Sequence, residues 1–198
     1  MTSSIAPLLV GLLTSQLPAL EVGDEIPRWR LPVENPSAWG SEHVDLRAFF
    51  DGGDRNDEQV VVTFGASWCG PCKLELKALL ELRSLLDEMR TQVVVVVADQ
   101  EPEGRAAMVA WLKADLQVPF AIVADDMGLL ARRYRTSELP ASFVADRQGR
   151  LIWAHAGWSS ETTPALLKTL RTGFEERPQG PADETTNALT GRDAQPPG

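Results

Sequence analysis

Apolar and polar residues alternate in blocks along the chain, and these blocks predict its strands and helices. Residues 58–64, EQVVVTF, form a short β-branched run that is typical of a strand buried on both faces. Residues 92–100 begin with five consecutive valines after a glutamine and predict a second buried strand. Between them, residues 73–90 follow the helical period. The predicted apolar stripe of this helix is Leu74, Ala78, Leu82, Leu85 and Met89.

The rest of the chain continues the alternation of strands and helices. The further predicted elements are a helix over 103–116, a strand over 119–125, a short helix over 127–135, a strand pair over 141–158 and a helix over 162–174. A turn around Gln148 and Gly149 joins the late strand pair. Residues 25–32 and 42–50 predict a small N-terminal strand pair. This order predicts an α/β fold, with a mixed central sheet flanked by helices on both faces.

The two ends of the chain differ from its centre. Residues 1–21 are almost uncharged with an apolar middle, which suits either a flexible arm or a weak export signal without its basic flank. Prolines and a glycine interrupt this segment, so it is a poor membrane span. Residues 175–198 are rich in Pro, Gly and Asp and predict a disordered tail. The predicted domain is therefore 22–174.

Composition and charge narrow the class of protein. The 198 residues are 43% hydrophobic and 24% charged, which suits one globular domain. A core of this size does not need a disulfide to hold it together. The net charge is −9 and no run of Lys or Arg is present, which argues against nucleic acid as a partner.

The only two cysteines lie in residues 68–72, WCGPC. Cys69 falls at the start of a predicted helix, directly after a buried strand, where unpaired N–H groups and the helix dipole favour its thiolate. Cys72 follows about one turn later and can close a small disulfide ring. We therefore assign Cys69 as the attacking thiolate and Cys72 as the resolving thiol of a redox-active disulfide.

Two other uses of the cysteines fit less well. A structural zinc site needs four ligands, and the only histidines are His43 and His155. A purely structural disulfide across two residues gains little from cross-linking. The pattern thus predicts redox chemistry with no metal and no cofactor beyond the disulfide itself.

The stretch VVTFGASWCGPCKLELKALL resembles the active-site segment of the thioredoxin superfamily, above all its TlpA/ResA-like branch of thiol–disulfide oxidoreductases. The segments VGDEIPRWRLP and ELPASFVADRQGRLIWAHAGW resemble that branch as well, so the likeness covers about residues 22–173. The resemblance implies a thioredoxin-like fold and an enzyme that reduces or exchanges protein disulfides.

The resemblance also implies roles for residues around the cysteines. Pro140 matches the family's cis-proline opposite the disulfide, and the backbone of Leu139 would pair with an extended substrate segment. A plain strand-entry proline is the alternative. Trp68 would flank and shield the disulfide, and Gly70 and Pro71 between the cysteines complete the predicted substrate-binding surface.

Glu75 is the third predicted catalytic residue. It follows Cys72 by three residues, so one helical turn brings it back toward the thiols. In the TlpA/ResA-like branch a glutamate at this place tunes and deprotonates the cysteines, whereas thioredoxins proper use an aspartate where this chain has Thr63. The alternative is a solvated helix glutamate paired with Lys73 or Lys77.

Two residues depart from the pattern of the resembling family. Lys77 replaces a helix-kinking proline, which predicts a straighter helix. Gly65 stands where an aromatic residue is common, which predicts a more open floor beneath the site. His155 has no acid or nucleophile near it in the sequence, and we expect it to be structural or at the surface.

Two other functions fit the sequence less well. A peroxiredoxin-like peroxidase would need a threonine three residues before Cys69, and that residue is Ala66. A redox-inactive binding module would have no need of both thiols. The expected partners are protein thiols and disulfides and an upstream redox partner, with a monomeric chain in the cell envelope or periplasm, or alternatively in the cytoplasm.

Overall fold

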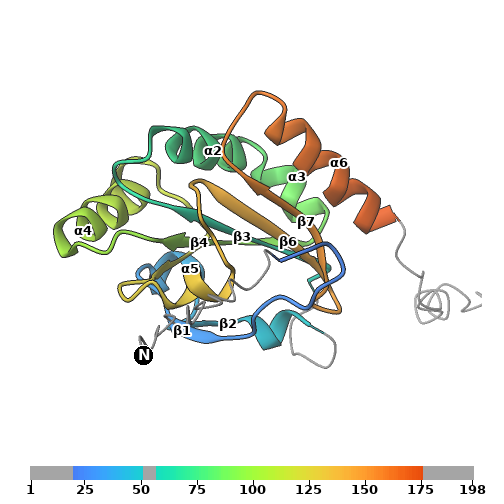
Figure 1. Cartoon of the computed structure of the whole chain (residues 1–198), viewed down its shortest axis with the longest axis horizontal. Helices are drawn as coiled ribbons and strands as arrows, with labels where there is room; N and C mark the ends of the chain where they lie inside the picture. The colour runs from blue at the N-terminus through green and yellow to red at the C-terminus, as the bar shows by residue number, and fades with distance from the viewer. Residues whose placement is uncertain (1–19, 51–56, 176–198) are drawn as a thin grey trace, which may run out of the picture.

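A five-stranded mixed sheet forms the centre of the computed structural model, which describes residues 20–50 and 57–175 (Figure 1). Its strands are β3 (Gln59–Gly65), β4 (Thr91–Val97), β5 (Ala121–Ala124), β6 (Ala141–Asp146) and β7 (Leu151–Ala156). They lie in the order β5-β4-β3-β6-β7, parallel from β3 to β5 and antiparallel from β3 through β6 to β7. The predicted mixed sheet is thus confirmed. Most of the predicted arm (1–21) and tail (175–198) lies outside the described residues.

Helices cover both faces of this sheet, as predicted. They are α2 (Gly70–Glu81), α3 (Arg83–Glu88), α4 (Pro102–Ala110), α5 (Leu129–Arg133) and α6 (Thr162–Glu175). Figure 1 shows α2, α3 and α6 on one face, and α5 on the other. The helix predicted over 103–116 is α4 followed by a π-helical turn, η2 (Trp111–Asp115).

Strand β3 separates two apolar clusters, which explains why it is buried along its whole length. Val60, Val62 and Phe64 belong to the cluster on the α5 side. Val61 belongs to the cluster that α2, α4 and α6 cover. Because successive strand residues point to opposite faces, Thr63 shares the face of Val61 and lies beneath α2.

The predicted N-terminal strand pair is also present. Strands β1 (Arg30–Pro32) and β2 (His43–Asp45) pair antiparallel in a separate small sheet. The short helix α1 (Pro36–Trp39) lies between them, and the 3-10 helix η1 (Leu46–Phe49) follows β2. The indole of Trp29 donates a hydrogen bond to the Tyr134 hydroxyl at 3.3 Å, which anchors this segment to the turn after α5.

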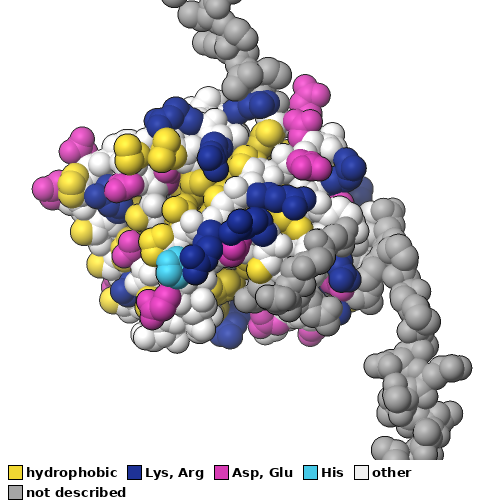
Figure 2. All heavy atoms as spheres, turned by 90° about the horizontal axis from the view of Figure 1, so that it is seen from below, with side chains coloured by type: hydrophobic (Ala, Val, Ile, Leu, Met, Phe, Trp, Pro, Cys, Tyr) yellow, Lys and Arg dark blue, Asp and Glu magenta, His cyan; other side chains and the backbone are white. Residues whose placement is uncertain are grey.

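Basic side chains gather on the face that carries the strand pair. Figure 2 shows this face, with Lys and Arg side chains in a band between apolar patches. Exposed Arg28 lies over the ring of Phe50 at 5.1 Å, and Arg47 is paired with Asp45 at 2.7 Å. This face thus carries basic side chains although the net charge of the chain is −9.

The single helix predicted over 73–90 is wrong in two respects. The chain forms two helices, α2 and α3, separated at Leu82. The buried residues of α2 are Cys72, Glu75, Leu76 and Leu79. Leu74, which began the predicted stripe, is 54% exposed. The buried face of α2 contains a carboxylate and a cysteine, so the apolar pattern indicated a neighbouring face there, whereas Leu82, Leu85 and Met89 of the predicted stripe do pack in the core.

Candidate active site

The two cysteines meet where β3 runs into α2. Cys69 is the N-cap of α2 and Cys72 lies in its first turn, and a disulfide joins them with a Cα–Cα distance of 5.3 Å. The Sγ atom of Cys69 also accepts a hydrogen bond from the backbone N–H of Cys72 at 3.2 Å. Both residues are almost fully buried, so only a small edge of the pair is open to solvent.

The local sequence explains why the helix begins at this point. Pro71 lies in the first turn, where the backbone N–H has no helical acceptor, so its missing N–H costs nothing. Gly70 and Pro71 are both exposed, and a side chain on Gly70 would meet nothing within 4 Å. The pair thus leaves one side of the disulfide open to an approaching group. The helix N-terminus stabilises negative charge on Cys69 when the disulfide is reduced.

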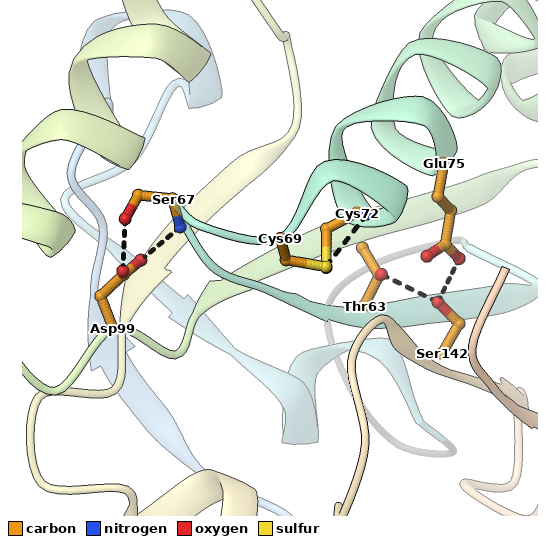
Figure 3. Close-up of a disulfide and its surroundings, with 7 residues drawn as sticks. All are labelled: Thr63, Ser67, Cys69, Cys72, Glu75, Asp99 and Ser142. Atoms are coloured by element: carbon orange, nitrogen blue, oxygen red, sulfur yellow. Dashed lines mark hydrogen bonds between the residues drawn. A yellow bond between two sulfur atoms is a disulfide. The ribbon is translucent and has the colours of Figure 1, made fainter.

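The sequence did not predict that Asp99 holds the loop before Cys69 in place. Asp99, just beyond the end of β4, accepts hydrogen bonds from Ser67, at 2.9 Å from its N–H and at 2.6 Å from its hydroxyl (Figure 3). A Cβ at Gly104 would lie 2.7 Å from Asp99 Oδ1, so α4 packs closely against this carboxylate. Parallel strands end at the same edge of a sheet. The position of Asp99 directly after β4 could therefore have predicted that it lies near the loop after β3.

Glu75 is buried beneath α2, with 2% of its surface exposed. Its Oε1 atom lies 2.5 Å from the Ser142 hydroxyl, which in turn lies 2.8 Å from the Thr63 hydroxyl. Figure 3 shows Glu75 one turn beyond Cys72, with its carboxylate directed toward Ser142. The alternative of a solvated glutamate is thereby excluded. Lys73 instead lies over the ring of Trp111, at 5.6 Å.

Burial raises the pKa of Glu75 from 4.5 to about 7. Loss of water around the carboxylate is the main cause, since it penalises the charged form. Hydrogen bonds from Ser142 and then Thr63 act in the opposite direction and lower the pKa. The result is a carboxyl group that can take up or release a proton near neutral pH.

Leu139 lies beside the disulfide, and Pro140 follows it directly before β6. The peptide bond between them is cis, as the resemblance implied. Leu139 packs against the small cluster of Ala66, Cys69 and Cys72. The carbonyl of Pro140 accepts a hydrogen bond from the N–H of Gly157 at 2.8 Å, which ties this segment to the end of β7.

Trp68, Gly65 and Lys77 were also singled out in the sequence. Trp68 is 74% exposed and stands at the surface next to the buried pair. A Cβ at Gly65 would lie 3.3 Å from Cys72 Cβ and 3.5 Å from Met108 Cε. The predicted open floor is therefore wrong, because Met108 from α4 closes it. Helix α2 passes through Lys77 without interruption.

His155 is partly buried on β7, and its contacts fit the structural role expected of it. Its Nε2 atom lies 3.2 Å from the Thr162 hydroxyl, and its ring stacks on Trp153. Within residues 20–50 and 57–175 no group of three His, Cys, Asp or Glu side chains could hold a metal ion. The helices in the same part of the chain are too short or too polar to cross a membrane.

The sheet order, the covering helices and a disulfide at the helix N-terminus define a protein of the thioredoxin-like fold. The chain belongs to the AhpC/TSA family, whose model matches residues 22–154.

Named relatives agree with the resemblance to the ResA-like branch. The chain is 36% identical over 117 residues to the "Thiol:disulfide interchange protein DsbE homolog" of Paracoccus denitrificans. That alignment covers 56% of this chain and 60% of the relative, so it spans well under two thirds of that protein. The chain is also 28% identical to the thiol-disulfide oxidoreductase ResA of Bacillus thuringiensis, over 67% of this chain and 68% of the relative.

Solved structures show the same fold. StoA from Bacillus subtilis has a TM-score of 0.56 at 20% identity, over 72% of this chain and 96% of that one. Peroxidoxin BcpB from Mycobacterium tuberculosis has a TM-score of 0.58 at 19% identity, over 77% and 97% of the two chains. Identities this low support the fold and leave the choice of chemistry to the site.

Proposed function

We propose that this protein reduces or exchanges protein disulfides, with Cys69 as the attacking thiolate and Cys72 as the resolving thiol. The observation that carries the proposal is the disulfide between the N-cap residue of α2 and its first turn. Cys69 has the helix N-terminus to stabilise its charge, and the exposed Gly70 and Pro71 leave it approachable.

The reaction proceeds in two exchanges. The reduced Cys69 thiolate attacks one sulfur of a substrate disulfide, which forms a mixed disulfide and releases the other substrate sulfur as a thiolate. Cys72 then loses its proton and attacks Cys69, which closes the Cys69–Cys72 disulfide and releases the second substrate thiolate. Both substrate thiolates take up protons. The substrate disulfide gains two electrons, and the protein dithiol loses two.

Glu75 serves as the base of the second exchange. It lies one helical turn beyond Cys72, and its pKa of about 7 suits it to accept a thiol proton near neutral pH. Burial from water also keeps the accepted proton local until the disulfide closes.

The substrate would be an extended segment of another protein. Its proposed binding surface is Trp68, Gly70, Pro71, Leu139 and Pro140. Leu139 packs against the cysteines, and its backbone would pair with the segment in the manner of strand addition. We place the protein in the cell envelope as a monomer that an upstream redox partner reduces, on its likeness to the ResA-like branch. The cytoplasm is the alternative compartment.

Equilibration against glutathione buffers tests the proposal directly. We expect a reversible two-electron transition between the dithiol and the disulfide, followed by thiol alkylation and by tryptophan fluorescence. A reduction potential of about −270 mV is expected for a reductant of protein disulfides. A reduction potential of about −120 mV would reverse the direction of electron flow, so that the protein would donate disulfides. The absence of any transition would leave only a redox-inactive binding module.

The family name and the peroxidoxin neighbour make peroxide reduction the second candidate. Residue Ala66 offers no hydroxyl to hold a peroxide, and it is fully buried beside Cys69. We expect peroxide consumption no faster than that of a Cys69→Ala variant, measured with the same reductant. Consumption that depends on Cys69 and outpaces disulfide reduction would favour the peroxidase.

A further inference from the structure

The surroundings of Glu75 contain a second, hydroxyl layer. Ser142 on β6 and Thr63 on β3 are direct partners in the antiparallel ladder, so both side chains point to the same face of the sheet, toward α2. Ser142 is 1% exposed and Thr63 is also 1% exposed. Their hydroxyls are 2.8 Å apart, and the Ser142 hydroxyl reaches Glu75 Oε1 at 2.5 Å.

The hydrogen atoms of this trio can be assigned for both forms of Glu75. A hydroxyl has one hydrogen to donate and two lone pairs to accept with. When Glu75 is ionised, Ser142 donates to the carboxylate and accepts from Thr63. When Glu75 is protonated, the acid donates to Ser142, and Ser142 donates to Thr63. The Ser142 hydroxyl therefore remains hydrogen-bonded to Glu75 in both protonation states by rotation of hydroxyl hydrogens, with no movement of heavy atoms.

Two groups that can carry a proton lie on elements next to the trio. On α2, Cys72 lies one turn before Glu75 and carries a thiol when the disulfide is reduced. On β7, His155 is the ladder partner of Ser142 and is bonded to Thr162. Strands β3 and β6 present uncharged Val61 and Val144 to this side of the sheet. Among the described residues, the Ser142 hydroxyl bonds the Glu75 carboxylate directly and Thr63 bonds Ser142.

We propose that Ser142, backed by Thr63, is the positioning residue that holds Glu75 in place for proton exchange with Cys72. The inference rests on the proposed function and assigns a role to two residues for which the resemblance implies none. Ser142 acts through Glu75. Its loss is expected to alter the step that needs a proton acceptor and to spare the attack by Cys69.

Stopped-flow reaction of the reduced protein with an aromatic disulfide that releases a coloured thiolate separates the two steps. The first release reports attack by Cys69, and the second reports closure by Cys72. In Ser142→Ala the carboxylate loses a charge-assisted hydrogen bond, so the pKa of Glu75 rises. We expect the pH profile of the second release to move upward by about one pH unit. Below pH 7 this release should slow by about tenfold, with the first release unchanged.

Matched variants separate positioning from general damage. Ser142→Thr keeps the hydroxyl and should restore the wild-type profile, whereas Thr63→Val should shift it in the same direction as Ser142→Ala but less. In a Glu75→Gln background, Ser142→Ala should have no further effect. His155→Gln should leave the profile in place.

The outcomes distinguish this role from the proposed function. A wild-type reaction that stops after the first release would overturn the function and the role together. Two releases with an unshifted Ser142→Ala profile, or the same shift in the Glu75→Gln background, would overturn the role of Ser142 alone. Should Ser142→Ala fail to fold, Thr63→Val and Ser142→Thr decide the same point.

Discussion

Replacement of Cys72 by alanine is expected to stop turnover and to leave Cys69 in stable mixed disulfides with its substrates. The resolving sulfur lies on the same helical turn, with 5.3 Å between the two Cα atoms, so closure is intramolecular and outpaces any thiol from solution. Without it, the mixed disulfide has no internal route to break. We expect disulfide reduction to fall by at least about a thousandfold, as is usual when a covalent catalytic group is removed.

The trapped species can be counted on non-reducing gels after alkylation of free thiols. Cys69→Ala is the matched control, because it retains one cysteine in the same helix and should trap almost nothing. The Cys69→Ala/Cys72→Ala double variant defines the background. Trapping by Cys69→Ala with none by Cys72→Ala would reverse the assignment of the two thiols, and equal trapping would show that either thiol can attack. No trapping by either variant would contradict a role in disulfide exchange.

The cysteine pair shows what the sequence can predict well. Two cysteines separated by two residues, after a buried strand and at the start of a helix, predict a disulfide. The end of the strand and the first turn of the helix fix the positions of the two cysteines. Strand β3 was equally predictable, because a short run of β-branched apolar residues is typical of a strand buried on both faces. The mixed sheet with helices on both faces followed from the alternation of elements, and the separate strand pair from its own pattern.

Glu75 shows why other parts could not be predicted. Patterns of apolar residues assume that a buried helix face is apolar, and here the buried face carries Glu75 and Cys72. The stripe was therefore assigned to the face that includes exposed Leu74. The partners of this carboxylate come from elsewhere in the chain: Ser142 is 67 residues away, and no local pattern links them.

A buried carboxylate also has a thermodynamic cost that bears on its function. Glu75 occupies a place beside Leu76 and Leu79 where an apolar side chain would pack without losing water. The hydroxyls of Ser142 and Thr63 offset only part of the loss, since the pKa of Glu75 stays well above its ordinary value. Residues kept at such a cost are commonly those that a reaction requires.

Glu75→Gln is accordingly expected to stabilise the oxidised protein above pH 7. The folded chain holds the Glu75 proton up to a pKa of about 7, whereas the unfolded chain releases it near 4.5. Stability from this group is therefore fully present below 4.5 and is lost as the pH rises through 7. The loss amounts to about 3 kcal/mol. Glutamine has nearly the same shape and does not titrate, so it should avoid most of this loss while it also abolishes the base.

Urea unfolding of oxidised wild-type and variant proteins at about pH 5 and about pH 8 measures the effect, with the disulfide intact in every sample. The advantage of Glu75→Gln should be small at the lower pH and approach about 3 kcal/mol at the higher, with a rise in melting temperature of roughly 6–12 °C. Glu81→Gln is the control, because Glu81 is exposed on the same helix and its replacement should change little at either pH. A stability difference that does not grow with pH would show that Glu75 is ionised without cost in the folded protein. Its suitability as a proton acceptor for Cys72 would then lose its physical basis.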